Sequence, residues 1–233
     1  MKNIFILVIA VLSVITFSSC KVETVKDYGL VKTYPINVAD FSAVSISYPC
    51  DVVYVPSDTF SVVVKAPENL KDRLQVYVKD GELVINESEE SNEIRIISNL
   101  PSHTQVLVKA PVLVRVSIKG TGDFICKSTI KTPQLYMSIA GSGDIDVKNI
   151  EANVVSAGIA GSGDMKAGLK NVAKTEMQIA GSGDMDFNFR DCGDVKASIA
   201  GSGDITLTGN VKSFHNDVSG AGDIDASKLI ITK

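Results

Sequence analysis

The chain has 233 residues, with 23 Lys and Arg against 27 Asp and Glu, a formal net charge of −4 and no Trp. An acidic chain without a basic patch interleaved with aromatic residues has no electrostatic basis for binding nucleic acid, so we exclude nucleic acid as a partner. Its length supports one elongated domain or two small ones.

The first 36 residues predict a leader and a tether. Residues 4–17 form an apolar run after the basic start Met1-Lys2-Asn3, which is too short to span a bilayer comfortably but is typical of a signal-peptide core. The run ends at Phe17-Ser18-Ser19-Cys20, which resembles the lipobox of bacterial lipoproteins. We therefore predict a signal peptide over 1–19 and lipidation of Cys20, which would hold the protein on a membrane of the cell envelope, at the outer membrane. The alternative is a plain secretory signal with Cys20 as an ordinary thiol.

Residues 20–36 are polar and weakly patterned, as expected for a lipid-anchored tether. Residues 37–113 then predict an irregular N-terminal β region, because short alternating segments are separated by turn residues. We expect one or two helical turns from Pro67 and a solvated loop over the acidic run 87–93. Ser45–Val52 echoes the later repeat and indicates a degenerate first coil. The expected strands lie near 41–48, 52–55, 61–64, 74–78, 83–85, 94–97 and 106–108.

One short phrase, Gly-Ser-Gly-Asp or a close variant, returns six times in residues 114–233. Apolar and polar residues alternate on both sides of it, which predicts strand, tight turn, strand in every repeat. Units of this kind at intervals of about 20 residues predict an all-β fold, a parallel β-helix or solenoid of stacked coils. The first glycines of the phrase are Gly120, Gly141, Gly161, Gly181, Gly201 and Gly220.

Stacking would turn equivalent positions into columns. The glycines fit a corner that needs either positive φ or close backbone approach. Three apolar columns should point inward: Ile118, Ile139, Ile159, Ile179, Ile199 and Val218; Phe124, Ile145, Met165, Met185, Ile205 and Ile224; and Cys126, Val147, Ala167, Phe187, Leu207 and Ala226.

The aspartates of the phrase would form a column of carboxylates. Neighbours ~4.8 Å apart repel by roughly 0.9 kcal/mol even at the dielectric of water, so something must offset the repulsion. One alternative is capping of backbone N–H groups at each turn, and the other is a ladder of bound cations, with Ca²⁺ as the ion that suits oxygen ligands. The candidate ligands are Asp123, Asp144, Asp164, Asp184, Asp204 and Asp223.

Beside this column we expect a flat outward strip of small residues, with Lys119 and Lys166 nearby. The strip comprises Ser142, Ser162, Ser182 and Ser202 with Ala140, Ala160, Ala180 and Ala200.

Three cysteines remain after Cys20. Cys126 falls in an inward column, whereas Cys50 and Cys192 have turn-like neighbours. Their spacing predicts neither a disulfide framework nor a zinc site.

Several segments occur in a characteristic order: Asp40-Phe41-Ser42, Asp51, Asn69-Leu70, Val76-Tyr77-Val78, Gly81–Ile85 and above all the serial Gly-Ser-Gly-Asp phrases. This order resembles that of a bacterial family, the auto-transporter adhesin, head GIN domain. The resemblance covers about residues 37–226. It implies a right-handed β-helix-like fold, a secreted or lipid-anchored envelope protein of Bacteroidetes and an adhesin role, and it supplies no catalytic residues.

The sequence favours a binding module over an enzyme. The two histidines, His103 and His215, do not sit in a catalytic motif, so we predict no catalytic residues. We expect a non-enzymatic surface module with an envelope protein or a glycan as partner. The alternatives are a lyase-like carbohydrate-active enzyme that uses the aspartate column with a cation, and a passive envelope scaffold. The final coil, from Asp223 to Lys233, would leave unpaired strand edges, which predicts a homodimer through that end of the solenoid.

Overall fold

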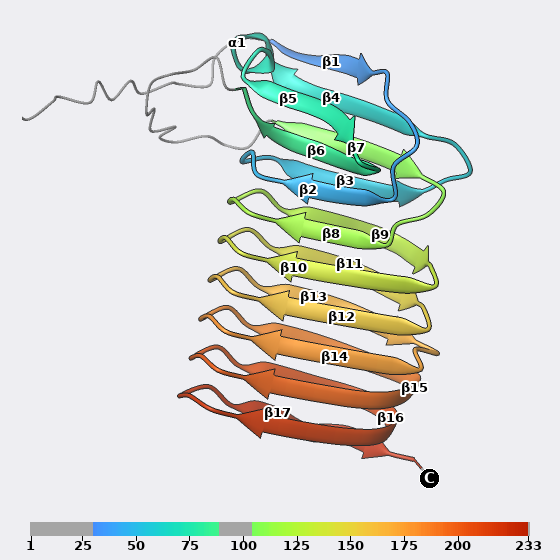
Figure 1. The fold of residues 1–233 in the computed structure, drawn as a ribbon, viewed down its shortest axis with the longest axis vertical. Coiled ribbons are helices and arrows are strands. Elements are labelled where there is room, and N and C mark those ends of the chain that lie inside the picture. The colour runs from blue at the N-terminus through green and yellow to red at the C-terminus, as the bar shows by residue number, and fades with distance from the viewer. Residues whose placement is uncertain (1–29, 89–103, 233) are drawn as a thin grey trace, which may run out of the picture.

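The computed structural model describes residues 30–88 and 104–232. Two β-sheets face one another and are joined at their long sides, so that the chain winds as a flattened solenoid of stacked coils (Figure 1). The prediction of an all-β solenoid is therefore confirmed. The strands are β1 (Val31–Ile36), β2 (Ala43–Ile46), β3 (Asp51–Pro56), β4 (Ser61–Pro67), β5 (Leu74–Lys79), β6 (Glu82–Glu87), β7 (Gln105–Ala110), β8 (Arg115–Ile118), β9 (Phe124–Lys131), β10 (Gln134–Ile139), β11 (Ile145–Glu151), β12 (Val154–Ile159), β13 (Met165–Lys170), β14 (Lys174–Ile179), β15 (Met185–Ile199), β16 (Ile205–Val218) and β17 (Ile224–Ile231), and the helix α1 is Glu68–Lys71.

The two sheets can be traced from the strand pairing. Sheet A contains β5, β6, β2, β8, β10, β12 and β14, followed by the second halves of β15 and β16. Sheet B contains β1, β4, β7, β3, β9, β11 and β13, the first halves of β15 and β16, and then β17. The long strands β15 and β16 turn the corner from sheet B to sheet A without a break.

The core lies between the two sheets. Equivalent residues of successive coils stand opposite one another, as Ile139, Ile159 and Ile179 do in sheet A. The three predicted apolar columns are buried in every coil except the last. Alternating strands thus place one continuous set of apolar side chains inside and the polar ones outside.

The degenerate first coil is confirmed, but its place in the stack could not be foreseen. Ile46 of β2 pairs with Ile118, and Val52 of β3 pairs with Phe124, in the register of the later repeats. On its other side the same coil pairs with β6 and β7, which come later in the chain. The second coil in sequence therefore lies outside the first.

Antiparallel strands cover the N-terminal end of the solenoid. β4 and then β1 extend sheet B, and β5 extends sheet A. β1 corrects the predicted tether, since Val31–Ile36 is a paired strand in which Tyr34 and Ile36 pack against the core. The predicted helical turn after Pro67 is α1.

Several predictions fall outside the described residues. They are the signal peptide, Cys20, most of the tether, the strand near 94–97, most of the acidic run and His103. Within the described ranges, the helical structure is too short and too polar to cross a bilayer.

Candidate binding surface

The glycine corners are held by close backbone approach. A Cβ on Gly141 would lie 2.0 Å from the carbonyl oxygen of Gly120, and a Cβ on Gly161 would lie 1.9 Å from that of Gly141. The alternative of positive φ is wrong for these corners, because among the described glycines only Gly81 and Gly209 have positive φ, 75° and 96°. Glycine is needed here because one coil rests directly on the backbone of the next.

The aspartate column is an inter-coil hydrogen-bond ladder. The backbone N–H of Asp144 donates to Oδ1 of Asp123 at 2.8 Å, and the backbone N–H of Asp164 donates to Oδ1 of Asp144 at 2.7 Å. The same contact recurs at 2.8–2.9 Å up to Asp223. Each carboxylate thus caps an N–H group of the following coil, whereas the expected cap was within its own turn.

This ladder supplies the hydrogen bonds that the capping alternative requires. One carboxylate oxygen of each aspartate from Asp123 to Asp204 is occupied by a backbone donor. Over the described ranges, no group of three or more His, Cys, Asp or Glu side chains is gathered as a metal ion would need. The other alternative, a ladder of bound Ca²⁺ ions, has no such set of ligands among the described residues to support it.

Asp51 stands one coil before Asp123 in position but is not part of the ladder, because the backbone N–H of Asp123 donates to the carbonyl oxygen of Cys50 at 3.1 Å. Its neighbour Val52 pairs with Phe124, so Asp51 lies next to Asp123. Burial, with a smaller effect from the Asp123 carboxylate, raises the pKa of Asp51. Burial also raises the pKa of the Cys50 thiol, to about 12. Cys50, Cys126 and Cys192 are all free and buried.

The outward strip along the corner is exposed as predicted, and so are Lys119 and Lys166. It is flat, since its side chains are those of Ser and Ala. His215 lies elsewhere, on the outer face of sheet A, opposite Lys196 in the neighbouring strand. The structure therefore does not bring the histidine to the aspartate column.

The outer face of sheet A is hollowed across four coils. A depression of about 380 Å³ lies over β10, β12, β14 and the second half of β15. Two rows of outward residues cross it at right angles to the strands: Tyr136, Ser156, Glu176 and Lys196 form one row, and Ser138, Gly158, Gln178 and Ser198 form the other. Neighbouring members of a row are ~4.8 Å apart along the solenoid.

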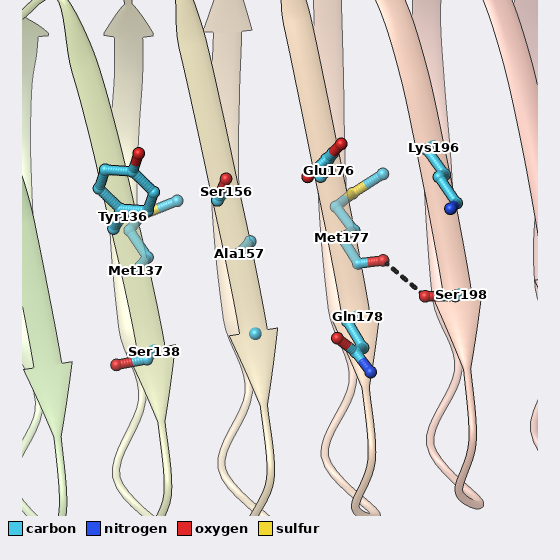
Figure 2. A pocket seen from close by; sticks show the side chains of 11 residues that line it. Tyr136, Met137, Ser138, Ser156, Ala157, Glu176, Met177, Gln178, Lys196 and Ser198 are labelled. Atoms are coloured by element: carbon cyan, nitrogen blue, oxygen red, sulfur yellow. Dashed lines mark hydrogen bonds between the residues drawn. The ribbon is translucent and has the colours of Figure 1, made fainter.

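The depression exists because β12 carries small outward residues between two strands with larger ones. Figure 2 shows the outward Ser156 between Tyr136 on one side and Glu176 on the other. A Cβ on Gly158 would meet nothing within 4 Å. Unlike the corner glycines, Gly158 is not required by packing, and its effect is to leave the surface open.

The rim of the depression is polar and charged. Glu176 accepts a hydrogen bond from Lys174 at 2.8 Å, and this contact lowers the pKa of Glu176, with a smaller effect from Lys196. The Tyr136 side chain is 41% exposed and its hydroxyl reaches Gln134 Oε1 at 3.5 Å. Ser198 donates to the carbonyl oxygen of Met177 at 3.3 Å. The rim thus offers an aromatic ring, a carboxylate, an amide and an ammonium group to a ligand.

Sequence reasoning missed this surface. The signal was present: Gly158 interrupts an outward column of Ser138, Gln178 and Ser198, and Tyr136 is a large aromatic at an outward position. It was overlooked because the repeated glycine phrase drew the candidates to the corner.

Solved structures of low sequence identity share the fold. A "putative adhesin" from Bacteroides fragilis has a TM-score of 0.70 at 20% identity, covering 88% of this chain and 100% of that one. A "Putative lipid binding protein" from Parabacteroides distasonis has a TM-score of 0.69 at 19% identity, covering 89% and 100%. Another structure from P. distasonis, a "putative adhesin", has a TM-score of 0.56 at 18% identity, covering 89% and 100%. No curated protein matches. Residues 40–170 and 169–233 match the family described as "Putative auto-transporter adhesin, head GIN domain", and the chain belongs to that family.

Proposed function

We propose that this protein is a non-enzymatic, lipid-anchored adhesin of the cell envelope that binds an extended glycan across the outer face of sheet A. Membership of the adhesin family supports a surface interaction module. The observation that carries the ligand and its location is the depression over Gly158, bordered by Tyr136, Glu176 and Lys196.

The chemistry of the rim suits a carbohydrate. An exposed aromatic ring can pack against the apolar face of a sugar, and carboxylate, amide and ammonium groups can bond its hydroxyls. The depression spans four coils, and each of them contributes at least one polar side chain to it. A polymer with regularly spaced hydroxyls can therefore lie across several coils, and the single aromatic side chain at the rim predicts weak binding at each sugar.

The binding test is an array of bacterial and host surface polysaccharides, followed by titration of the strongest ligand. Tyr136→Ala should weaken binding by about tenfold, since it removes an aromatic interaction of about 1 kcal/mol together with the area that the ring buries. Tyr77→Ala is the matched control, because Tyr77 of β5 is similarly exposed, at 38%, but lies away from the depression. Equal effects of the two substitutions, or a wild-type chain that binds no glycan, would contradict the proposal.

Lipid anchoring and the lack of catalysis have separate tests. Cys20→Ser should abolish incorporation of radiolabelled fatty acid and move the protein out of the membrane fraction. A bound polysaccharide should be recovered with unchanged chain length after long incubation with Ca²⁺. Shortened or unsaturated products would favour the lyase-like alternative, and an anchored chain without any ligand would favour the passive scaffold.

A further inference from the structure

The two ends of the solenoid are built differently. Antiparallel strands close the N-terminal end, and the outermost of them, β1, contains Pro35, which has no N–H to donate. The last coil at the C-terminal end consists of Ser213–Val218 of β16 in sheet A and β17 in sheet B (Figure 1). In the part of the chain that the structure describes, no strand pairs with the outer edges of these two segments.

The apolar core is open at this end. Val218 is 43% exposed and Ile231 is 59% exposed, although their counterparts one coil earlier, Ile199 and Val211, are buried. Phe214, Ile224 and Leu229 are only partly buried. Unpaired backbone groups and half-exposed core residues therefore occur together on one face.

We propose that this open end binds the same end of a second copy of the chain about a two-fold axis. If this axis is perpendicular to the two sheets, sheet A of one copy continues into sheet A of the other, and sheet B into sheet B. The strands of the two copies then run in opposite directions. β17 then pairs antiparallel with its own copy in sheet B, and Ser213–Val218 does so in sheet A. The contact uses both open edges, so it closes at the dimer and cannot grow into a fibre.

The charges on β17 fit this arrangement. Asp225 and Lys228 are both exposed on the outer side of the strand, opposite Thr206 and Thr208 of β16. Antiparallel pairing about a point between Ala226 and Ser227 sets Asp225 opposite Lys228 of the partner subunit, and the symmetry makes this pair twice. Opposite charges directly across an antiparallel pair stabilise it.

The size of the end face predicts a weak dimer. Strands of six and eight residues at ~3.3 Å per residue are roughly 20–26 Å long. Two sheets ~10 Å apart, with outward side chains that add ~5 Å on either side, are ~20 Å thick, which gives a face of roughly 500 Å² per copy. The total of roughly 1,000 Å² lies at the lower limit for specific interfaces. Asn216 weakens the contact further, because it stands exposed in the inward column that Ala197 and Met177 occupy in earlier coils.

The position of this face determines where the N-terminal segments of the two copies lie in the dimer. β1, which follows the N-terminal segment with Cys20, lies at the opposite end of the solenoid (Figure 1). This step rests on the proposed lipid anchor. A contact between C-terminal ends then places the two anchors at the far ends of the dimer, which joins chains on facing membranes. The contact is therefore a homophilic one between two cells.

Sedimentation velocity over a concentration series tests the dimer, using the chain from residue 21 on, which contains every described residue. The wild type should be a reversible dimer at high concentration. Val218→Lys and Ile231→Lys should each weaken it by about tenfold or more, since the new ammonium group must either be buried in the interface or hold the two edges apart. Val31→Lys is the matched control, because Val31 is 50% exposed at the other end. Thermal melting confirms that each variant is folded.

A charge swap tests the register. Asp225→Lys and Lys228→Asp should each weaken the dimer, and the double variant should restore it because each lysine again faces an aspartate across the two-fold axis. A wild-type monomer at concentrations approaching millimolar, a dimer abolished only by Val31→Lys, or open-ended oligomers would overturn the proposal. A double variant no better than the single ones would overturn the antiparallel register.

Vesicles test the facing arrangement. A chain beginning at Cys20 can be coupled through that thiol to a maleimide lipid, because Cys50, Cys126 and Cys192 are buried. Vesicles that carry it should cluster, whereas those carrying Val218→Lys, or a chain tethered by its C-terminus, should not. A solution dimer whose vesicles stay dispersed would overturn the contact between membranes. Tyr136→Ala should leave clustering unchanged, so this inference and the proposed glycan site can fail separately.

Discussion

The backbone N–H of Asp164 donates a hydrogen bond to Oδ1 of Asp144, its counterpart one coil earlier, at 2.7 Å. The contact repeats along the column, so the side chain that recurs in every repeat joins each coil to the next. Its hydrogen bonds offset the repulsion between stacked carboxylates.

Removing one carboxylate of the ladder should destabilise the fold, whereas replacing that carboxylate by an amide should not. Asp164→Ala leaves the N–H of Asp184 without its acceptor, at a cost of about 1 kcal/mol because water can replace part of the bond. Asp164→Asn keeps an oxygen acceptor and removes the negative charge that is repelled by Asp144 and Asp184. The stability of this variant should therefore equal or exceed that of the wild type. Urea unfolding measures both, with Asp58→Ala as a control for a carboxylate outside the column. An equal loss for Ala and Asn would show that charge matters and capping does not.

A methyl group at a glycine corner should be poorly tolerated. In Gly141→Ala the new Cβ would lie 2.0 Å from a backbone oxygen, so the coils must separate and stability should fall by about 3 kcal/mol or more. Gly158→Ala is the matched control, because a Cβ there meets nothing within 4 Å. It should be neutral or stabilising by up to about 1 kcal/mol. Similar melting temperatures for the two variants would contradict the close stacking.

Asp51 should make stability depend on pH. Its pKa is raised in the folded state by burial and by Asp123, from an ordinary value of 3.8. A raised carboxyl pKa means that the folded state binds the proton more tightly, so the penalty is full above the folded pKa and absent below the unfolded one. Asp51→Asn should therefore raise the melting temperature by a few degrees at pH 7 and have no such effect at pH 3. A gain that is equal at both values would mean that the charge of Asp51 is not its cause.

Calcium should not stabilise the protein. The aspartate carboxylates already accept backbone hydrogen bonds, and the described residues gather no larger set of ligands. A site with a dissociation constant a hundredfold below the added Ca²⁺ would stabilise the folded state by about 2.7 kcal/mol. We expect equal melting temperatures with Ca²⁺ and with a chelator. A clear rise with Ca²⁺ that Asp164→Asn removes would establish the cation ladder.

The repeats could be predicted in detail from the sequence because their determinants are local. Alternation around the glycine phrase identified the strands, and the constant period fixed which residues stack, so buried columns such as Ile139 and Ile159 followed directly. The N-terminal order did not follow, since pairing of β2 with both β6 and β8 depends on contacts between segments far apart in the chain.

The candidate site was predicted only in part. The aspartate column was found because identical residues recur, but the sequence could not show that each carboxylate bonds the next coil. The depression over Gly158 depends on one small residue in one coil and on the size of its neighbours across the sheet. A departure from a repeat carries little statistical signal, although it is what makes one part of a regular surface different from the rest.

The most direct test of the proposed binding surface is titration of the strongest array ligand into the wild type and Gly158→Arg. An arginine at this position has open space around its Cβ, so the fold and the melting temperature should be retained while the side chain fills the depression. We expect binding to fall by about tenfold or more at an unchanged melting temperature. Undiminished glycan binding by a folded Gly158→Arg variant would contradict it.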